Sequence, residues 1–141
     1  MTHDERVRTD QRTGLVELST AECWELLEAN GTGRVAVSVG TTPDIFPVSY
    51  LVRDGEIVIR TEAGTKLAAA TMMTSVAFEI DRFDEDDHRG WSVVVKGRGR
   101  EPTSLTEVLA FDELDLEPWV DASKSRWLAI TPREVTGRRI P

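Results

Sequence analysis

The segment from Arg60 to Lys66 has the residue types of an anion-binding turn. A β-rich run ends at Arg60, a turn with one glycine follows, and Thr65 and Lys66 open an alanine-rich stretch that predicts a helix over 66–73. Backbone N–H groups at a helix N-terminus, a hydroxyl and two cations can together hold a phosphate, although the glycine spacing differs from that of a P-loop. The alternative is that Thr65 only caps the helix while both cations lie in solvent.

Two tryptophans also occupy positions where they could contact a ligand. Trp91 and Ser92 begin a long β-rich segment, and Trp127 begins the last expected strand. A tryptophan is more often simply part of the core, but an aromatic side chain near the mouth of a barrel can also cover a planar ring. Arg138 and Arg139 fit either a solvated basic tail or an ordered element, and the Thr-Gly pair before them favours the ordered element.

The sequence offers little support for hydrolytic or metal-dependent catalysis. His3 lies in a polar N-terminal stretch and His88 in an acidic loop. The sequence has no serine, histidine and carboxylate set at a recognisable spacing, and no cysteine and histidine cluster that could hold zinc. Hydrolase and metalloenzyme functions are therefore disfavoured, and no metal is expected. The single cysteine, Cys23, falls in a helical apolar pattern that predicts a buried helix residue.

Length, charge and hydropathy narrow the class of protein. The chain has 141 residues, which fits one domain, and its net charge of −8 opposes binding to nucleic acid. No apolar run approaches the roughly 18 residues needed to cross a bilayer, and no signal segment precedes the domain, so we expect a cytoplasmic protein. Residues 1–17 are expected to form a mobile N-terminal arm, and residues 18–141 the folded domain.

The domain begins with a helix and continues as β-strands. Ser19 and Glu22 have the spacing of a capping box, which predicts a helix over 20–29, and Asn30-Gly31 is expected to end it in the left-handed conformation. A second capping pattern predicts a helix over 104–109. Alternating or β-branched runs predict six strands, at 34–39, 45–52, 56–61, 75–81, 90–100 and 127–131, with a tail over 135–141.

The strand pattern indicates how these elements assemble. Pro47 inside the second strand predicts a sheet edge or a bulge, and Asp54-Gly55 predicts a hairpin turn. Several short antiparallel strands interrupted by helices are typical of a closed or partly closed barrel, because closure removes exposed sheet edges. The expected fold class is therefore mainly β, a six-stranded antiparallel barrel with short helices.

Taken in order, the segments resemble the pyridoxamine 5'-phosphate oxidase-like FMN-binding split-barrel family over about residues 18–140. The segments that carry the resemblance are Leu18–Trp24, Gly33–Ala36, Phe46–Tyr50, Arg60–Leu67, Phe78–Asp81, Gly90–Gly97 and Thr131–Arg139. The resemblance implies a homodimer of split barrels with FMN bound in two symmetric clefts at the subunit interface. Each flavin would then contact both chains.

The resemblance also assigns residues to the flavin. Pro47, Val48, Ser49 and Tyr50 would run beside the isoalloxazine ring. The phosphate would be held by Arg60, Thr61, Thr65 and Lys66, in agreement with the anion-binding turn. Trp91 and Ser92 would border the ring from the partner chain.

The expected function is a flavin-dependent oxidoreductase acting on an unknown small molecule. The arginine and histidine pattern that true pyridoxamine phosphate oxidases carry near their C-terminus is not evident, which argues against oxidation of vitamin B6. Relatives of this short type are linked to nitroimidazole reduction, to a deazaflavin coenzyme, or to no known substrate. The alternatives are a non-catalytic protein that binds or stores FMN, a deazaflavin or a tetrapyrrole, and a structural homodimer without a cofactor.

Overall fold

The computed structural model describes residues 8–62, 66–73, 75–118 and 125–141. Three helices occur in these ranges: α1 (Thr20–Ala29), α2 (Lys66–Met73) and α3 (Leu105–Asp112). The strands are β1 (Arg8–Thr9), β2 (Val16–Glu17), β3 (Thr32–Val39), β4 (Thr42–Arg53), β5 (Glu56–Glu62), β6 (Ser75–Asp84), β7 (Arg89–Arg100) and β8 (Ser125–Ile140). None of these helices is long and apolar enough to span a bilayer.

Six of the strands close into a ring. The sheet order is β1-β2-β8-β5-β4-β3-β6-β7, and β7 pairs a second time with β8. Residues Ser125–Ile130 of β8 pair with β5, whereas β8 pairs with β7 from Ala129 onward. Every ladder is antiparallel, so the mainly β, six-stranded antiparallel barrel predicted from the sequence is confirmed.

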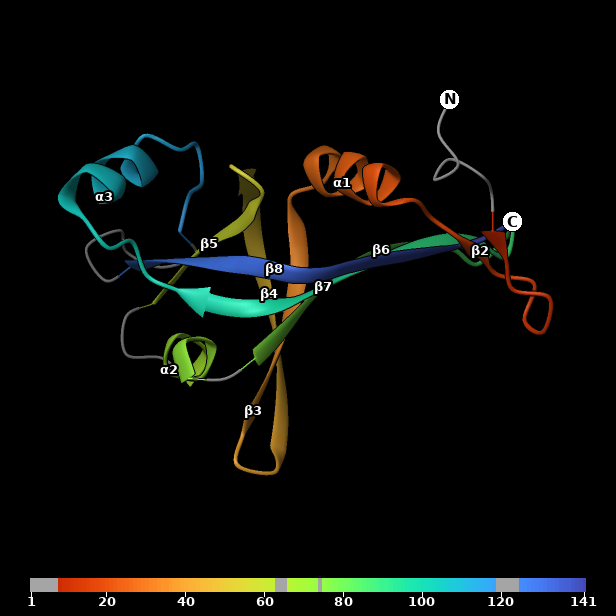
Figure 1. The fold of residues 1–141 in the computed structure, drawn as a ribbon, viewed down its shortest axis with the longest axis horizontal. Helices are drawn as coiled ribbons and strands as arrows, with labels where there is room; N and C mark the ends of the chain where they lie inside the picture. Colours follow the sequence, from red (N-terminus) through yellow and green to blue (C-terminus); the bar gives the residue numbers. More distant parts are fainter. Residues whose placement is uncertain (1–7, 63–65, 74, 119–124) are drawn as a thin grey trace.

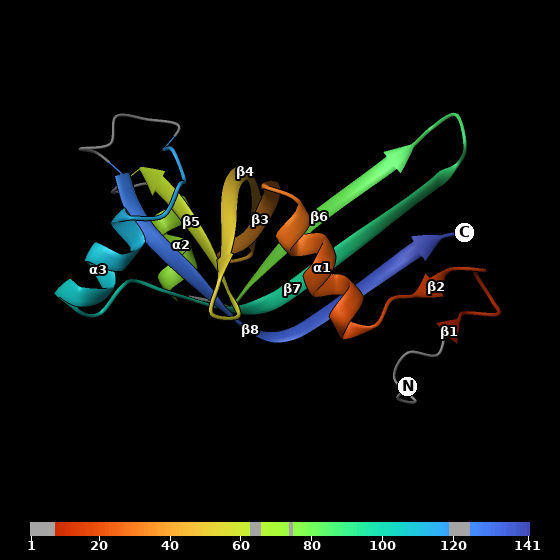
Figure 2. The same cartoon turned by 90° about the horizontal axis from the view of Figure 1, so that it is seen from above.

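Three of the strands continue beyond the ring. β6 pairs with β3 only over Ala77–Glu79, but it pairs with β7 along its whole length. The far ends of β6, β7 and β8 therefore form a projecting ribbon, to whose β8 edge β2 adds (Figure 2). We call this ribbon the wing: residues 81–84 of β6, 89–92 of β7 and 138–140 of β8.

The helices close the barrel and cover part of its outer face. Cys23 and Leu27 of α1, and Leu67 and Ala68 of α2, join the core inside the ring. Figure 1 shows α1 and α2 on opposite sides of the strands. A smaller apolar cluster lies beneath α3 and contains Val58, Phe111, Leu116, Trp127 and Ala129. Burial of Cys23 agrees with its prediction as a core residue.

The start of α1 follows the sequence rule, but its end does not. The Ser19 hydroxyl accepts a hydrogen bond from the Glu22 N–H at 3.1 Å, and Glu22 accepts one from the Ser19 N–H at 3.0 Å. The predicted left-handed stop is wrong, because Asn30 is extended and Gly31 has no positive φ. Instead the Asn30 side chain donates to the carbonyl of Leu26 at 2.8 Å, which satisfies an end carbonyl directly.

Two predictions about β4 are confirmed: the sheet edge at Pro47 and the hairpin turn at Asp54-Gly55. Pro47 pairs with β3 but lies outside the β4–β5 ladder, which covers only Tyr50–Arg53, so its missing N–H costs no ladder bond on that side. Asp54 and Gly55 have φ values of +50° and +74°. Positive φ at both central residues is what a tight hairpin turn of the Asp-Gly kind requires.

The two ends of the domain differ from the sequence prediction. Residues 8–17, which were assigned to the arm, contain β1 and β2, and Val16 is buried where β2 pairs with β8. Residues 1–7 lie outside the described residues, and mobility of the arm stays a prediction. The tail predicted over 135–141 is wrong, since β8 runs on to Ile140. This part of β8 pairs with β7 on one side and with β2 on the other. The composition of the segment does not indicate these partners, which are distant in sequence.

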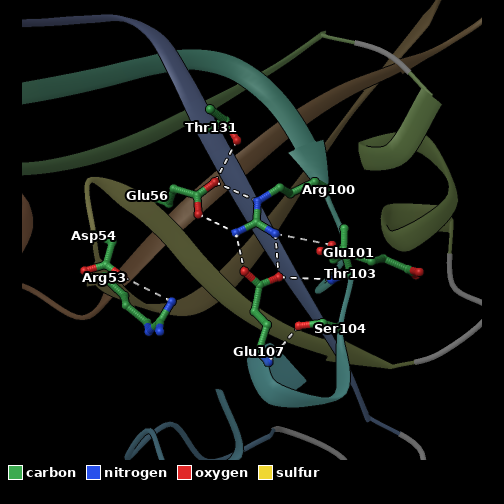
Figure 3. A network of polar contacts seen from close by, with 9 residues as sticks. All are labelled: Arg53, Asp54, Glu56, Arg100, Glu101, Thr103, Ser104, Glu107 and Thr131. Atoms are coloured by element: carbon green, nitrogen blue, oxygen red, sulfur yellow. Dashed lines mark hydrogen bonds and ion pairs between the residues drawn. The ribbon is translucent and has the colours of Figure 1, made fainter. Parts of the chain in front are cut away.

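A charged network fastens α3 to the barrel (Figure 3). Arg100, at the end of β7, donates to Glu56 at 2.6 Å and to Glu107 in the first turn of α3 at 2.7 Å. The Thr131 hydroxyl also donates to Glu56, at 2.7 Å. Ser104 caps α3 by accepting from the Glu107 N–H at 3.1 Å. Hydrogen bonds from Arg100 lower the pKa of both carboxyl groups, so the network is charged at neutral pH.

Candidate functional site

Apart from the four residues on β4, the predicted site residues fall into two groups that lie far apart on one chain. Arg60 of β5 pairs with Trp127 near the start of β8, whereas Trp91 of β7 pairs with Arg139 near its end. An extended strand rises roughly 3.3 Å per residue, which separates Trp127 from Arg139 by up to about 40 Å along β8. A single chain therefore does not bring the predicted phosphate residues to Trp91 and Ser92, the two residues expected to border the ring from the partner chain.

The four residues predicted on β4 alternate between the core and the outer face. Val48 and Tyr50 are buried inside the barrel, whereas Pro47 is exposed and Ser49 is partly exposed. The Tyr50 hydroxyl donates to the carbonyl of Leu27 in α1 at 2.6 Å, and burial raises the pKa of Tyr50 to about 12. Tyr50 is therefore a core residue that fixes α1, and only Pro47 and Ser49 present side chains to the outside.

The predicted phosphate residues are described only in part. Arg60 is half-buried: its Nε donates to the Ser125 hydroxyl at 2.9 Å and its Nη1 to the Leu116 carbonyl at 3.2 Å. Its guanidinium also lies 4.7 Å from the centre of the Trp127 ring. Thr61 follows Arg60 in β5, Lys66 begins α2 as predicted, and Thr65 lies outside the described residues. The solvated alternative therefore does not hold for Arg60, while phosphate binding stays a prediction.

The second group lies in a cleft on the wing. Ser92 stands opposite Asp81 on β6 and Arg138 on β8, and Trp91 stands opposite Arg82 and Arg139. The cleft, which we call the wing cleft, has a volume of about 380 Å³. It is lined by Leu15, Glu79, Asp81, Arg82, Phe83, Gly90, Trp91, Ser92, Arg138, Arg139 and Ile140. Both predicted wing residues thus border one cavity that combines aromatic, apolar and cationic groups.

The wing cleft is lined by arginines that form no ion pair within the described ranges and by carboxylates that do. Arg82, Arg138 and Arg139 form no ion pair among the residues that the structure describes. At the cleft's other border, Glu79 and Asp81 share the guanidinium of Arg34, each at 3.0 Å. Burial, followed by the neighbouring Asp81, raises the pKa of Glu79. The cleft therefore offers three arginine side chains, outside any ion pair of the described residues, that can bind an anion.

A second cleft adjoins the first around the same strand ends. It has a volume of about 490 Å³ and shares Trp91, Arg82 and Arg139 with the wing cleft, while adding Arg89. Trp91 also packs against the main core, which confirms its structural interpretation, while contact with a ligand stays a prediction. The end of β7 that carries Trp91 is thus surrounded by four arginines, Arg82, Arg89, Arg138 and Arg139.

Sequence reasoning missed part of the wing cleft. Arg82, Phe83 and Ile140 were not predicted to belong to a site, and Arg138 and Arg139 were left between a tail and an ordered element. The Thr136–Arg139 segment is the part of the sequence that could have indicated these residues. Gly137 lies where a Cβ atom would meet the Cys23 sulfur at 2.7 Å, so close packing requires a glycine there. A glycine required by close packing argues for an ordered strand.

Comparison with known proteins agrees with this architecture. A family model described as pyridoxamine 5'-phosphate oxidase matches residues 19–139. The uncharacterized protein Rv0080 of Mycobacterium tuberculosis is 37% identical over 131 residues, which cover 89% of this chain and 86% of that protein.

The solved structures that share both fold and sequence with this chain include two FAD-binding proteins. The FAD binding protein from Mycobacterium smegmatis has a TM-score of 0.77 and 35% identity, covering 89% of this chain and 99% of that one. A FAD-binding protein from Mesorhizobium loti has a TM-score of 0.75 and 25% identity, covering 89% and 97%. Since the family match spans nearly all of the six-stranded barrel and its wing, the chain belongs to the pyridoxamine 5'-phosphate oxidase-like family of split-barrel proteins.

Proposed function

We propose that this protein binds a flavin nucleotide in the wing cleft and uses it to oxidise or reduce a small molecule. The observation that carries the proposal is the meeting of unpaired cations with an aromatic and apolar wall in one cleft. Arg82, Arg138 and Arg139 suit the anionic end of a nucleotide, because guanidinium groups form strong charge-assisted bonds to phosphate. Trp91 and Phe83 suit the edge or face of a planar ring.

The relatives support the same ligand class. Two of the solved relatives at 25% identity or more are FAD-binding proteins, and the family is that of pyridoxamine 5'-phosphate oxidase. The resemblance in sequence favours FMN, whereas the adjoining cleft around Trp91 and Arg89 gives room and charge for the adenylate part of FAD. Titration of the protein with each nucleotide distinguishes the two.

A bound flavin supplies hydride and single-electron transfer. The protein's residues bind and orient the ligand: the wing arginines of one chain and the Arg60–Lys66 segment of the other would together hold its negative end, and Trp91 with Ser92 borders its ring. Glu79, whose pKa is raised mainly by burial, adds a carboxyl group to the border of the cleft. Because the redox chemistry comes with the flavin, no further catalytic side chain is required.

The active form in this proposal is a homodimer. The residues expected to hold the phosphate, Arg60 to Lys66, and those expected to border the ring, Trp91 and Ser92, lie at opposite ends of β8. A second copy related by a two-fold axis can bring one group against the other, giving two identical sites. Light scattering that gives the mass of a monomer at micromolar protein would contradict this arrangement.

Absorbance and titration test the flavin proposal. The purified protein is expected to carry, or to bind on titration, FMN or FAD, with mass spectrometry of the released ligand identifying which. Arg138→Gln and Arg139→Gln should each weaken binding, by the roughly 1.5–3 kcal/mol typical of a charge-assisted hydrogen bond. Arg98→Gln is the matched control, since Arg98 is an exposed arginine of β7 outside the cleft. Lack of binding of either nucleotide would refute the proposal.

A second measurement separates an oxidoreductase from a passive flavin carrier. Reduced flavin on the protein is mixed with oxygen, quinones and nitroaromatic compounds, and the rate of reoxidation is compared with that of free flavin. Faster reoxidation by one acceptor supports catalysis and indicates the class of substrate. Equal or slower rates with every acceptor would leave binding without turnover as the function.

A further inference from the structure

β8 contains a bulge whose extra residue is Arg133. Lys96 and Gly97 follow one another on β7, yet they pair with Glu134 and Pro132, so Arg133 has no partner in the ladder. A bulge bends a strand and redirects a side chain, and such bulges are frequent near functional sites. Gly97 fits the close approach, because a Cβ atom there would lie 2.1 Å from the carbonyl oxygen of Thr131.

The bulge brings Arg133 to the outer face of the barrel. Ile130 before the bulge and Gly137 after it are both buried, although they are seven positions apart and would face opposite sides of a regular strand. Arg133 and Glu134 are consequently both exposed, although they are adjacent in sequence. The Nη2 atom of Arg133 donates to the Ser75 hydroxyl of β6 at 2.8 Å, which holds the guanidinium over that strand.

A cavity of about 320 Å³ lies beside this guanidinium. β3 and β6 provide a floor of small apolar side chains that includes Ala36 and Ala77, and Ser38 and Ser75 provide hydroxyl groups. Lys96 and Arg133 provide the only cationic side chains of its lining. The cavity shares no lining residue with the wing cleft, so it is a separate feature of the barrel.

The two cations are not neutralised by the chain. Arg34 and Arg100 each bond to two carboxylates, but neither Lys96 nor Arg133 forms an ion pair within the described part of the chain. Glu134 stands opposite Lys96 in the ladder without forming an ion pair with it. In a protein of net charge −8, two unneutralised cations at one hollow attract an anion specifically to that place.

We propose that this cavity binds a small organic phosphate. The phosphate would lie between Lys96 and Arg133 with Ser38 and Ser75 as further hydrogen-bond donors, and a compact apolar group would rest on the alanine floor. A volume of about 320 Å³ is at the small end of ligand pockets, which suits a molecule of one ring and one phosphate. The proposal stands on the bulge and its cavity, and it does not depend on flavin binding.

Calorimetric titration of the full-length protein with phenyl phosphate at low ionic strength tests this site. Binding is expected to be tighter than for inorganic phosphate, absent for phenol, and weakened by added salt. Lys96→Gln and Arg133→Gln should each weaken it roughly tenfold or more, the value of one charge-assisted hydrogen bond. Glu134→Gln should tighten it, because the substitution removes a negative charge beside Lys96.

Arg138→Gln is the control that assigns the probe to this cavity, since Arg138 lines only the wing cleft. Phenyl phosphate affinity unchanged in Lys96→Gln and Arg133→Gln, or lost in Arg138→Gln, would overturn the proposal. Both substituted side chains are exposed, so the melting temperature should stay that of the natural chain. Flavin titration of the same variants should be unaffected, which keeps failure here distinct from failure of flavin binding.

Discussion

Tyr50 is the one tyrosine of the chain, so its titration can be followed without interference from another phenol. Burial raises its pKa to about 12 in the folded protein, and its hydroxyl donates to the Leu27 carbonyl. We expect tyrosinate absorbance of the native protein to appear only near pH 12, and near pH 10 when urea unfolds the chain. A native titration at the ordinary tyrosine value would show that the hydroxyl is accessible to water.

The same residue makes stability depend on alkaline pH. Because the folded pKa lies above the unfolded one, the contribution of Tyr50 is complete below about pH 10 and is lost as the pH rises toward 12. Tyr50→Phe should abolish this alkaline decline. At neutral pH it should cost about 1–2 kcal/mol of unfolding free energy, because the Leu27 carbonyl loses its donor. Urea denaturation of both proteins across the alkaline range measures the two effects.

Single residues show where sequence reasoning was sufficient and where it was not. The pattern of Val48 and Tyr50 predicted a strand correctly, but only the register shows that both face the core, leaving Pro47 and Ser49 outside. Arg60 was expected either to bind phosphate or to lie in solvent. Its bonds to Ser125 and Leu116 join segments far apart in sequence, and no local pattern reveals such partners.

The network around Arg100 is expected to stabilise the attachment of α3. Arg100→Gln leaves Glu56, with a side chain only 15% exposed, without its cationic partner, which should cost roughly 1–3 kcal/mol of unfolding free energy. Arg34→Gln is the matched control, since Arg34 also bonds two carboxylates but its side chain is 54% exposed. Surface pairs contribute little, so the control should be close to neutral. Equal losses in the two variants would contradict the special position of Arg100.

Acid should weaken this network. Hydrogen bonds from Arg100 lower the folded pKa of Glu56, so its contribution is complete above the unfolded value, near pH 4.5, and is lost as the pH falls through the lower folded value. We therefore expect the unfolding free energy of the natural chain to decline on acidification below about pH 4.5. Glu56→Gln should show a shallower decline over that interval. Chemical denaturation at a series of acidic pH values provides the comparison.

The bulge of β8 requires a glycine on the opposite strand. Gly97→Ala would place a methyl group against the Thr131 carbonyl, a backbone atom that cannot rotate away, so we expect a loss of about 2 kcal/mol or more. Gly31→Ala is the control, because a Cβ atom there meets nothing within 4 Å and the residue has no positive φ. That control should be neutral or slightly stabilising. A stable Gly97→Ala protein would show that the ladder can shift.

Element boundaries could be predicted where the determinants are local. Ser19 and Glu22 fixed the start of α1, and Asp54-Gly55 fixed the hairpin turn, because capping and turn conformation depend on neighbours in sequence. The length of β8 could not be predicted in this way. Its second half is a strand because β7 and β2 pair with its two edges, and both partners are distant in sequence.

At the scale of the whole molecule, ring closure decides where the predicted site residues lie. The six strands and their antiparallel pattern were predicted, but the second pairing of β7, with β8, is non-local. This pairing carries Trp91 and Ser92 out on the wing, away from Arg60. The family resemblance predicted that these groups belong to different chains of a dimer, and their separation on one chain is what such a shared site requires.

A complementation experiment tests the shared site. Lys66→Ala removes a cation of the predicted phosphate group, and Arg138→Gln removes one from the wing cleft. Each variant alone should bind flavin weakly while keeping its fold, as circular dichroism would verify. If every site takes Lys66 from one chain and Arg138 from the other, a dimer formed from both variants has one site with two substitutions and one site with none.

Co-expression of the two variants should therefore restore tight flavin binding to about a quarter of all sites, because random pairing makes half of the dimers mixed. Titration measures this fraction directly, and each variant co-expressed with itself is the control that should show no restoration. If Lys66 and Arg138 instead served the same chain's site, every site would carry one substitution and mixing would restore nothing. The fraction of tight sites thus distinguishes a site built across two chains from one built within a single barrel.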